Sequence, residues 1–316
     1  MKDKDGIIIL IVIFIFVGFS WDSLKQEVRV NNANKTRTNA WENVFGNSSV
    51  GGDAVSEKDQ VGQIKEIERK TKELEKKIAE AEAQRMRSPY YGKVLLSYIA
   101  YLNDPDPSRE YLTLYTNLNK GEKIDITGWF LKSDRSGNSA TIGRASVMPY
   151  PYVAGGDNVV LHQGDRVYLV KGFSPINISF RTNLCTGYFE ENRTFYPSLS
   201  MQCPLARDEE LPKFSNLLDR EDECIEIIER IPRCTTIGNE FIRDLPDTVT
   251  SSCKTYLRTQ INYNACIANH RSDIDFPGQE WYVYLNRFGP LWRSQRETIK
   301  LYDQLGLVVS TLKYGF

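Results

Sequence analysis

Hydrophobic and polar positions divide the chain into four stretches with different periods. Residues 6–19 are an uninterrupted apolar run, residues 22–56 are polar without a period, residues 57–87 follow a heptad, and short apolar runs separated by turn residues continue from residue 88. A heptad is typical of a helix with one apolar seam, and short runs between turns are typical of strands. The pattern predicts an N-terminal apolar segment (1–21), a flexible linker (22–56), a helix (57–87) and a β domain (88–316).

The apolar run GIIILIVIFIFVGF follows Lys2 and Lys4 and predicts export or membrane insertion. As a helix its fourteen residues would span about 21 Å, short of the roughly 30 Å hydrocarbon core. That length favours a cleaved signal peptide, with Gly18 and Ser20 as small residues near the cut, and the protein would then be secreted. Trp21 favours an uncleaved helix with an interfacial anchor. We favour the membrane anchor, with most of the chain on the extracytoplasmic side, although the basic residues of the linker favour the opposite orientation.

The heptad between residues 61 and 87 predicts a coiled coil. Its seam positions are Ile64, Ile67, Leu74, Ile78 and Ala81, with Thr71 and Arg85 as polar exceptions. In a parallel pair of helices Lys70 would face Glu75 and Lys77 would face Glu82, so both flanking contacts join opposite charges. We therefore expect a homo-oligomer through residues 61–87. The alternative is a single solvated helix held by ion pairs four residues apart, and a sedimentation mass distinguishes the two.

The β domain is expected to be a sandwich or barrel, because short strands alternate with turn signals about every ten residues. A segment from about 185 to 276 interrupts this rhythm with two helical patterns, 214–231 and 247–261. Pro232 would end the first helix, and a serine or threonine is placed to cap the second. Strand patterns return near residue 280. A β domain with a helical insertion is the organisation that this order favours.

The stretch KIDITGWFL, residues 123–131, predicts a core strand rather than a ligand-binding strip. Alternate residues of a strand share a face, so Ile124 and Ile126 would point inward. Trp129 breaks this parity unless Gly128 marks a bulge, which glycine permits. We therefore interpret Trp129 as a buried residue of the core, with Gly128 as the bend beside it.

Four segments of the β domain resemble the lamin-tail domain family. They are Glu110-Tyr-Leu-Thr-Leu-Tyr-Thr-Asn117, Ile124-Asp-Ile-Thr-Gly-Trp-Phe-Leu131, Leu161-His-Gln-Gly-Asp-Arg-Val167 with its Gly164, and the closing stretch 297–309 with Tyr314. The resemblance covers about 90–184 and 277–316 and leaves the insertion unexplained. It implies an immunoglobulin-like sandwich that serves as a recognition or tethering module, of a type also found in exported bacterial proteins.

All six cysteines lie in or beside the insertion, at Cys185, Cys203, Cys224, Cys234, Cys253 and Cys266. An even number without a Cys-x-x-Cys pair favours disulfides over a zinc site, and disulfides imply an oxidising compartment. Fifteen pairings are open. Their spacing suggests that Cys185 and Cys203 close a local loop while the other four cysteines connect two helices. Zinc in a cytoplasmic protein is the alternative.

Charge and motifs exclude several classes of function. The chain carries 41 acidic and 40 basic residues, so no basic excess indicates a nucleic-acid partner. It has no motif of the well-marked hydrolases or nucleotide-binding folds, and we expect neither cofactor nor metal. Only two histidines occur. The stretch CIANHRSDID holds the one local cluster of ligand-type residues, His270, Asp273 and Asp275, for which a capped helix end beside a solvated acidic loop is the simpler interpretation.

These observations together predict a non-enzymatic, membrane-anchored protein of the cell envelope or surface. Its sandwich would display a recognition, adhesion or scaffolding surface for a protein or glycan partner, with specificity in the insertion. The alternative is an extracytoplasmic hydrolase with its site in the insertion. That hypothesis predicts a concave pocket on which His270, Asp273 and Asp275 converge, with a strongly shifted pKa.

Overall fold

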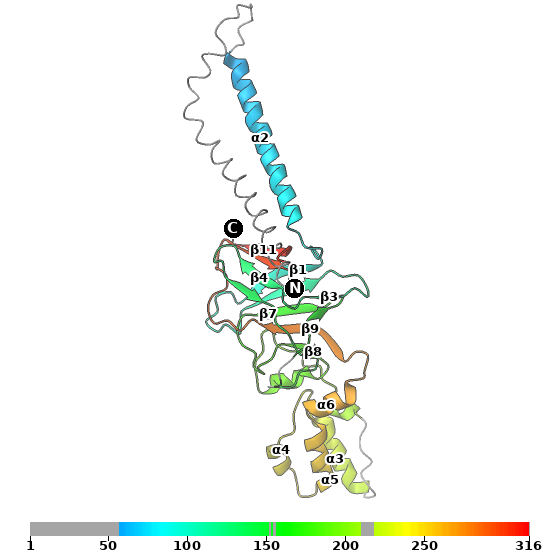
Figure 1. Cartoon of the computed structure of the whole chain (residues 1–316). Coiled ribbons are helices and arrows are strands. Elements are labelled where there is room, and N and C mark those ends of the chain that lie inside the picture. The colour runs from blue at the N-terminus through cyan, green and yellow to red at the C-terminus, as the bar shows by residue number, and fades with distance from the viewer. Residues whose placement is uncertain (1–56, 152, 154–155, 210–217, 316) are drawn as a thin grey trace, which may run out of the picture. The chain divides into compact units, whose positions relative to one another are not determined.

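The computed structural model describes residues 57–151, 153, 156–209 and 218–315 (Figure 1). The chain divides into two units, Met1–Leu74 and Glu75–Phe316. The predicted membrane segment and the linker lie outside the described residues. Among the helices that are described, none combines the length and the apolar character that a membrane crossing requires.

The helix α2 (Glu57–Arg85) confirms the helical pattern of the predicted coiled-coil segment. Glu66 and Lys70 form one of its ion pairs four residues apart, at 2.8 Å, the arrangement that stabilises an exposed helix. The seam residues Ile67, Leu74 and Ile78 are between 58% and 63% exposed. Self-association through this seam stays a prediction.

Two larger sheets, in which most neighbouring strands are antiparallel, and one small pair of strands make up the β domain. The five-stranded sheet has the order β1 (Val94–Ala100), β2 (Tyr111–Thr116), β7 (Arg166–Val170), β9 (Pro277–Tyr284) and β8 (Phe180–Asn183). The four-stranded sheet has the order β11 (Val308–Tyr314), β10 (Glu297–Tyr302), β4 (Phe130–Ser133) and β5 (Ser139–Thr141). The third pairs β3 (Ile124–Asp125) with β6 (Val160–Leu161). Only β7 and β9 pair in parallel among the described ladders.

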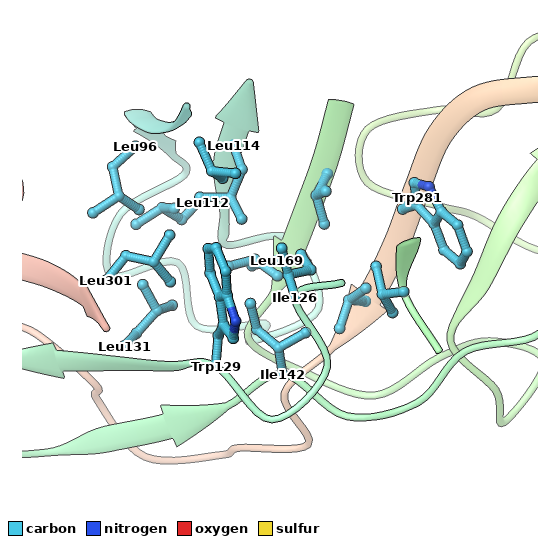
Figure 2. Packing of buried hydrophobic residues seen from close by; sticks show 14 of the residues in the cluster. Leu96, Leu112, Leu114, Ile126, Trp129, Leu131, Ile142, Leu169, Trp281 and Leu301 are labelled. Atoms are coloured by element: carbon cyan, nitrogen blue, oxygen red, sulfur yellow. The ribbon is translucent and has the colours of Figure 1, made fainter. Parts of the chain in front are cut away.

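Side chains of both large sheets enclose one hydrophobic core (Figure 2). Leu112 and Leu169 come from the five-stranded sheet and Leu131 and Leu301 from the four-stranded sheet. Two sheets around a shared core form a sandwich-like β fold, as predicted. The mainly β character that the strand pattern predicts belongs to this domain alone, because helices take up at least as much of the described chain as strands do.

Trp129 lies inside this core, as the sequence predicts. Its side chain is 2% exposed, and its peptide N–H donates to the Ile126 carbonyl at 3.1 Å. Gly128 adopts φ +82°, a left-handed conformation that glycine tolerates best. The bend takes the form of a turn between β3 and β4 rather than a bulge within a strand. Gly164 serves in the same way, with φ +83°, in the turn between β6 and β7.

The closing stretch of the family resemblance forms a hairpin of β10 and β11, residues 297–314. Asp303 caps its turn by accepting hydrogen bonds from the peptide N–H groups of Leu305 and Leu307, both at 2.9 Å. Gly306 supplies the residue with positive φ. Short-range hydrogen bonds of this kind depend on residues close in the sequence, so this turn is specified locally.

The helical insertion connects two strands that pair directly with each other, β8 and β9. Its regular elements are the short 3-10 helices η3 (Thr186–Glu191) and η4 (Ala206–Asp208) and the helices α3 (Leu218–Arg230), α4 (Asn239–Arg243), α5 (Ser251–Gln260) and α6 (Tyr263–His270). The helix α3 ends before Pro232, and the Thr250 hydroxyl caps α5 by accepting from the Cys253 N–H at 3.2 Å. Both local predictions for the two long helices are confirmed.

All six cysteines form disulfides, but the predicted pairing is correct only in part: Cys234 and Cys266 bond to Cys203 and Cys185 instead of connecting two helices. The bonds join Cys185 to Cys266, Cys203 to Cys234, and Cys224 to Cys253. A Cys224–Cys253 bond connects α3 and α5, as expected of two stapled helices. The proposed local Cys185–Cys203 loop does not form, because antiparallel pairing of β8 and β9 brings the two ends of the insertion together and places Cys185 opposite α6.

Candidate functional site

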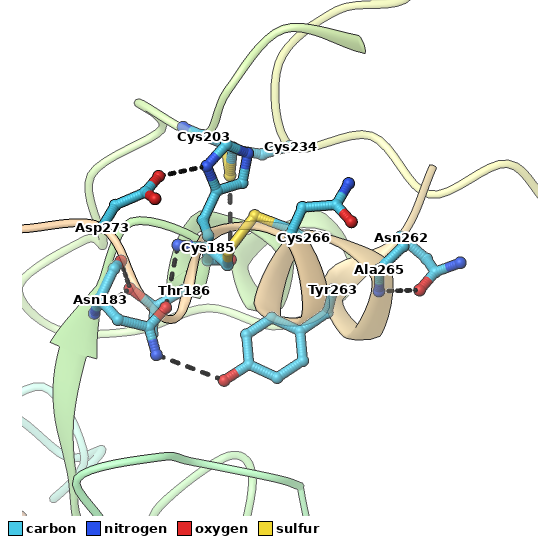
Figure 3. Close-up of a disulfide and its surroundings, with 12 residues drawn as sticks. Asn183, Cys185, Thr186, Cys203, Cys234, Asn262, Tyr263, Ala265, Cys266 and Asp273 are labelled. Atoms are coloured by element: carbon cyan, nitrogen blue, oxygen red, sulfur yellow. Dashed lines mark hydrogen bonds and ion pairs between the residues drawn. A yellow bond between two sulfur atoms is a disulfide. The ribbon is translucent and has the colours of Figure 1, made fainter. Parts of the chain in front are cut away.

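His270 bridges two carboxylates at the end of α6. Its Nδ1 lies 2.7 Å from Asp273 Oδ2 and its Nε2 lies 2.7 Å from Glu209 Oε1. The Cys185–Cys266 disulfide anchors the same helix to the end of β8 (Figure 3), and the Asn262 side chain caps its start through the Ala265 N–H. The predicted pair of His270 and Asp273 is therefore brought together, and Glu209 joins it.

Sequence reasoning missed Glu209, which lies 61 positions before His270. No local pattern links a residue in the loop after η4 to the last residue of α6. Both side chains of this pair are about one-fifth exposed. Asp275, the third residue of the predicted cluster, does not join it and lines a cavity instead.

Both ring nitrogens of His270 are occupied, which limits what this cluster does chemically. A general base needs a free nitrogen facing the substrate, whereas here each nitrogen faces a carboxylate. Neither histidine is hydrogen-bonded to a serine, threonine or cysteine side chain in the described part of the chain. Within those same residues no group of three or more metal-ligating side chains is arranged to hold an ion. With this geometry His270 connects α6 to the loop after η4.

The pKa of His270 reflects two opposing influences. Burial lowers the pKa, but hydrogen bonds to Glu209 and Asp273 outweigh it and raise the pKa above the ordinary value of 6.5. A raised folded-state pKa means that the charged ring stabilises the fold. That contribution is complete below pH 6.5 and is lost as the pH rises through the folded-state pKa.

We expect a proton NMR titration of the full-length chain to give His270 a pKa above 6.5. Glu209→Gln should lower that pKa, because it removes one of the two negative partners. His162→Gln assigns the signals, since His162 is the only other histidine. A wild-type pKa at or below the ordinary value would contradict the bridge.

A cavity of about 690 Å³ opens beside this cluster, between the ends of β8 and β9 and the insertion. This volume lies within the range of small-molecule sites. Ile274 is one of the lining residues, and it is fully exposed to solvent. The other lining residues are Thr182, Asn183, Leu184, Thr186, Ser200, Gln202, Asp275, Pro277, Gly278, Gln279 and Glu280.

Three segments distant in sequence form the cavity wall, and an irregular strand pairing opens it. Arg181 pairs with Trp281, and the next pair is Asn183 with Pro277. Between these pairs β8 has one residue and β9 has three, so β9 bulges. Gly278 permits the close approach there, because a Cβ at this position would lie 2.2 Å from Thr182 Oγ1. Arg181 fixes the bulge by donating from Nε to the Gly278 carbonyl at 2.8 Å.

Two disulfides hold the other walls of the cavity. Cys185 immediately precedes Thr186 and is bonded to Cys266, and Cys203 immediately follows Gln202 and is bonded to Cys234. The two disulfide-bonded segments therefore keep their places without a ligand. A wall that is ordered before binding reduces the entropy cost of binding.

Four polar side chains of the cavity have unused hydrogen-bonding capacity. Ser200, Gln202, Asp275 and Gln279 make no side-chain hydrogen bond or ion pair to any described residue, although all four line the same hollow. Their hydroxyl, amide and carboxylate groups supply both donors and acceptors. Among the described lining residues only Asp275 and Glu280 are charged and none is basic. Glu280 is paired with Arg166 at 3.7 Å, so the negative charge of Asp275 disfavours phosphate or other anionic ligands.

Comparisons with known proteins leave this site to be interpreted from its own geometry. No protein-family model matches the chain, and neither a curated protein nor a solved structure gives a significant match. The resemblance to the lamin-tail domain and the immunoglobulin-like topology therefore stay predictions.

Proposed function

We propose that this chain is an extracytoplasmic, membrane-anchored recognition protein whose insertion cavity binds a saccharide. The observation that carries the proposal is the disulfide-held cavity, which has four uncommitted polar side chains and, among the described residues, no basic side chain in its lining. Hydroxyl-rich neutral ligands need alternating donors and acceptors, which amides and hydroxyls provide. The three disulfides support a site outside the cytoplasm.

Binding is favoured over the alternative, extracytoplasmic hydrolysis, by the positions of the titratable residues. The hydrolase hypothesis needs His270, Asp273 and Asp275 to converge on one pocket. Only Asp275 lines the cavity, and His270 uses both ring nitrogens to bridge Asp273 and Glu209. The resemblance to a recognition module supports the same choice.

The test is retention of the purified full-length chain on immobilised neutral glycans. Mannan, cellulose and chitin serve as neutral probes, and heparin serves as the anionic probe. We expect retention on at least one neutral glycan and none on heparin, because the unpaired Asp275 carboxylate repels an anion and no described basic side chain lines the cavity. Gln202→Ala and Gln279→Ala should each weaken binding about threefold to tenfold, the loss of one hydrogen bond of about 0.5–1.5 kcal/mol.

Gln163→Ala is the matched control, because Gln163 is an exposed glutamine in the turn between β6 and β7 and is not among the residues that line the cavity. It should bind like the wild type. Absence of retention on all three neutral glycans would contradict the proposal. Release of reducing ends from a retained glycan would support the hydrolase alternative instead.

A further inference from the structure

A strip of five side chains, one from each strand, crosses the five-stranded sheet and ends at the cavity. The strand register places Leu95 of β1 opposite Tyr115 of β2, Tyr115 opposite Arg166 of β7, and Arg166 opposite Glu280 of β9. Thr182 of β8 completes the strip, since its hydroxyl donates to the Glu280 carbonyl at 3.1 Å and accepts from the Glu280 N–H at 3.3 Å. We call these residues the cross-strand strip.

The cross-strand strip faces away from the sandwich core. Neighbours of its members, including Leu96, Leu114, Val167 and Trp281, are buried in that core, and successive side chains of a strand point to opposite faces. The insertion covers only part of this outer face, through a second cluster that contains Phe189, Phe195 and Tyr282.

The members of the cross-strand strip are accessible and are held in place. Leu95 is 41% exposed, and the side chains of Arg166 and Glu280 are 43% and 31% exposed. The Arg166 guanidinium lies 5.0 Å from the centre of the Tyr115 ring and donates to the Tyr168 hydroxyl at 3.1 Å. The Tyr168 hydroxyl in turn donates to Glu280 at 2.8 Å. Such mutual support makes the strip a preformed surface.

The charges of the cross-strand strip balance each other. Arg166 Nη1 lies 3.7 Å from Glu280 Oε1, and the other three members carry no charge. A surface made of a tyrosine, an aliphatic side chain and one neutralised ion pair suits the apolar faces and hydroxyls of a neutral sugar chain. It offers no excess charge to a polyanion such as a nucleic acid.

The strip is continuous with the cavity, because Thr182 and Glu280 belong to both. Five strands separated by four gaps of roughly 4.8 Å span about 19 Å. We infer, on the basis of the saccharide binding proposed above, that the ligand is an extended neutral polysaccharide that lies along the cross-strand strip with one end in the cavity.

The test compares a disaccharide with a hexasaccharide of whichever glycan, mannan, cellulose or chitin, is retained by the full-length chain. Affinity should rise with chain length in the wild type. Tyr115→Ser should weaken hexasaccharide binding about tenfold, as expected for an anchor residue of an interface, and leave disaccharide binding unchanged. Gln279→Ala, in the cavity, should weaken binding of both sugars.

Tyr302→Ser is the matched control, because Tyr302 is a partly exposed tyrosine that stacks on Phe130 in the four-stranded sheet. It should change neither affinity. Equal affinities of the wild type for the two sugars, or unchanged hexasaccharide binding by Tyr115→Ser, would overturn the inference while saccharide binding in the cavity stands. A wild type that binds neither sugar would overturn both proposals.

Discussion

Replacing both Cys185 and Cys266 with alanine is expected to lower the free energy of unfolding by about 4 kcal/mol, according to the chain-entropy relation for cross-links. The bond spans 81 positions. The other two disulfides lie inside this loop and shorten the path that the bond closes. The expected loss of about 4 kcal/mol is calculated for this shortened loop. A loss of this size is a large share of the stability of an ordinary domain, and a denaturant titration followed by circular dichroism measures it.

The segment that loses stability in this double variant shows which part of the domain the disulfide anchors. Cys185 and Cys266 belong to the buried cluster that packs on β8 and β9 together with Tyr263 and Ile267. We expect hydrogen exchange of the α6 amides to accelerate in the double variant, and saccharide retention to fall as the cavity wall loosens.

The double variant of Cys224 and Cys253 is the matched control. That bond spans 29 positions, and its loss should cost about 3.5 kcal/mol. Its sulfurs lie in the separate cluster of α3 and α5, so exchange should accelerate in those helices and not in α6. Unchanged protection of α6 without the Cys185–Cys266 bond would contradict the assigned anchoring role.

Trp129→Ala is expected to destabilise the β domain by about 3 to 5 kcal/mol, the usual cost of removing a buried tryptophan. The ring is 2% exposed and packs in the core between the two sheets. Its loss leaves a cavity that a close-packed sandwich fills only in part. Urea unfolding followed by far-ultraviolet circular dichroism measures the effect without relying on tryptophan fluorescence.

Leu305→Ala provides the comparison for Trp129→Ala. Leu305 is 82% exposed in the turn of the β10–β11 hairpin, and its contribution there is the peptide N–H, which alanine keeps. Its effect should stay within about 0.5 kcal/mol. If Trp129→Ala abolished saccharide retention at unchanged stability, Trp129 would be a binding residue and the core interpretation would be wrong.

Elements that depend on neighbouring residues could be predicted from the sequence. The heptad predicted the helical character of α2, Pro232 ended α3, and the hydroxyl of Thr250 capped α5. The hairpin of β10 and β11 follows from Asp303 and Gly306, whose interactions span only a few positions. Burial of Trp129 followed from strand alternation together with the glycine before it.

Groupings of residues from distant segments could not be predicted in the same way. His270 and Asp273 lie three positions apart at a helix end, so the sequence could group them, whereas Glu209 reaches them from a remote loop. Asp275 lies only two positions beyond Asp273, but the chain there has no regular period, so nothing in the pattern showed that its side chain would line the cavity.

The sequence by itself determined most strands, the two longest helices of the insertion, the place of the insertion and the disulfide chemistry, because each depends on local periodicity, turn residues or residue type. The pairing of the cysteines, the cavity and the cross-strand strip were decided only by the tertiary structure. The Cys185–Cys266 bond, the cavity and the strip depend on the register of β9 against β7 and β8, which brings residues about a hundred positions apart into contact. The other two disulfides join segments within the insertion. That register is set by packing of the whole domain, and no short stretch of sequence contains it.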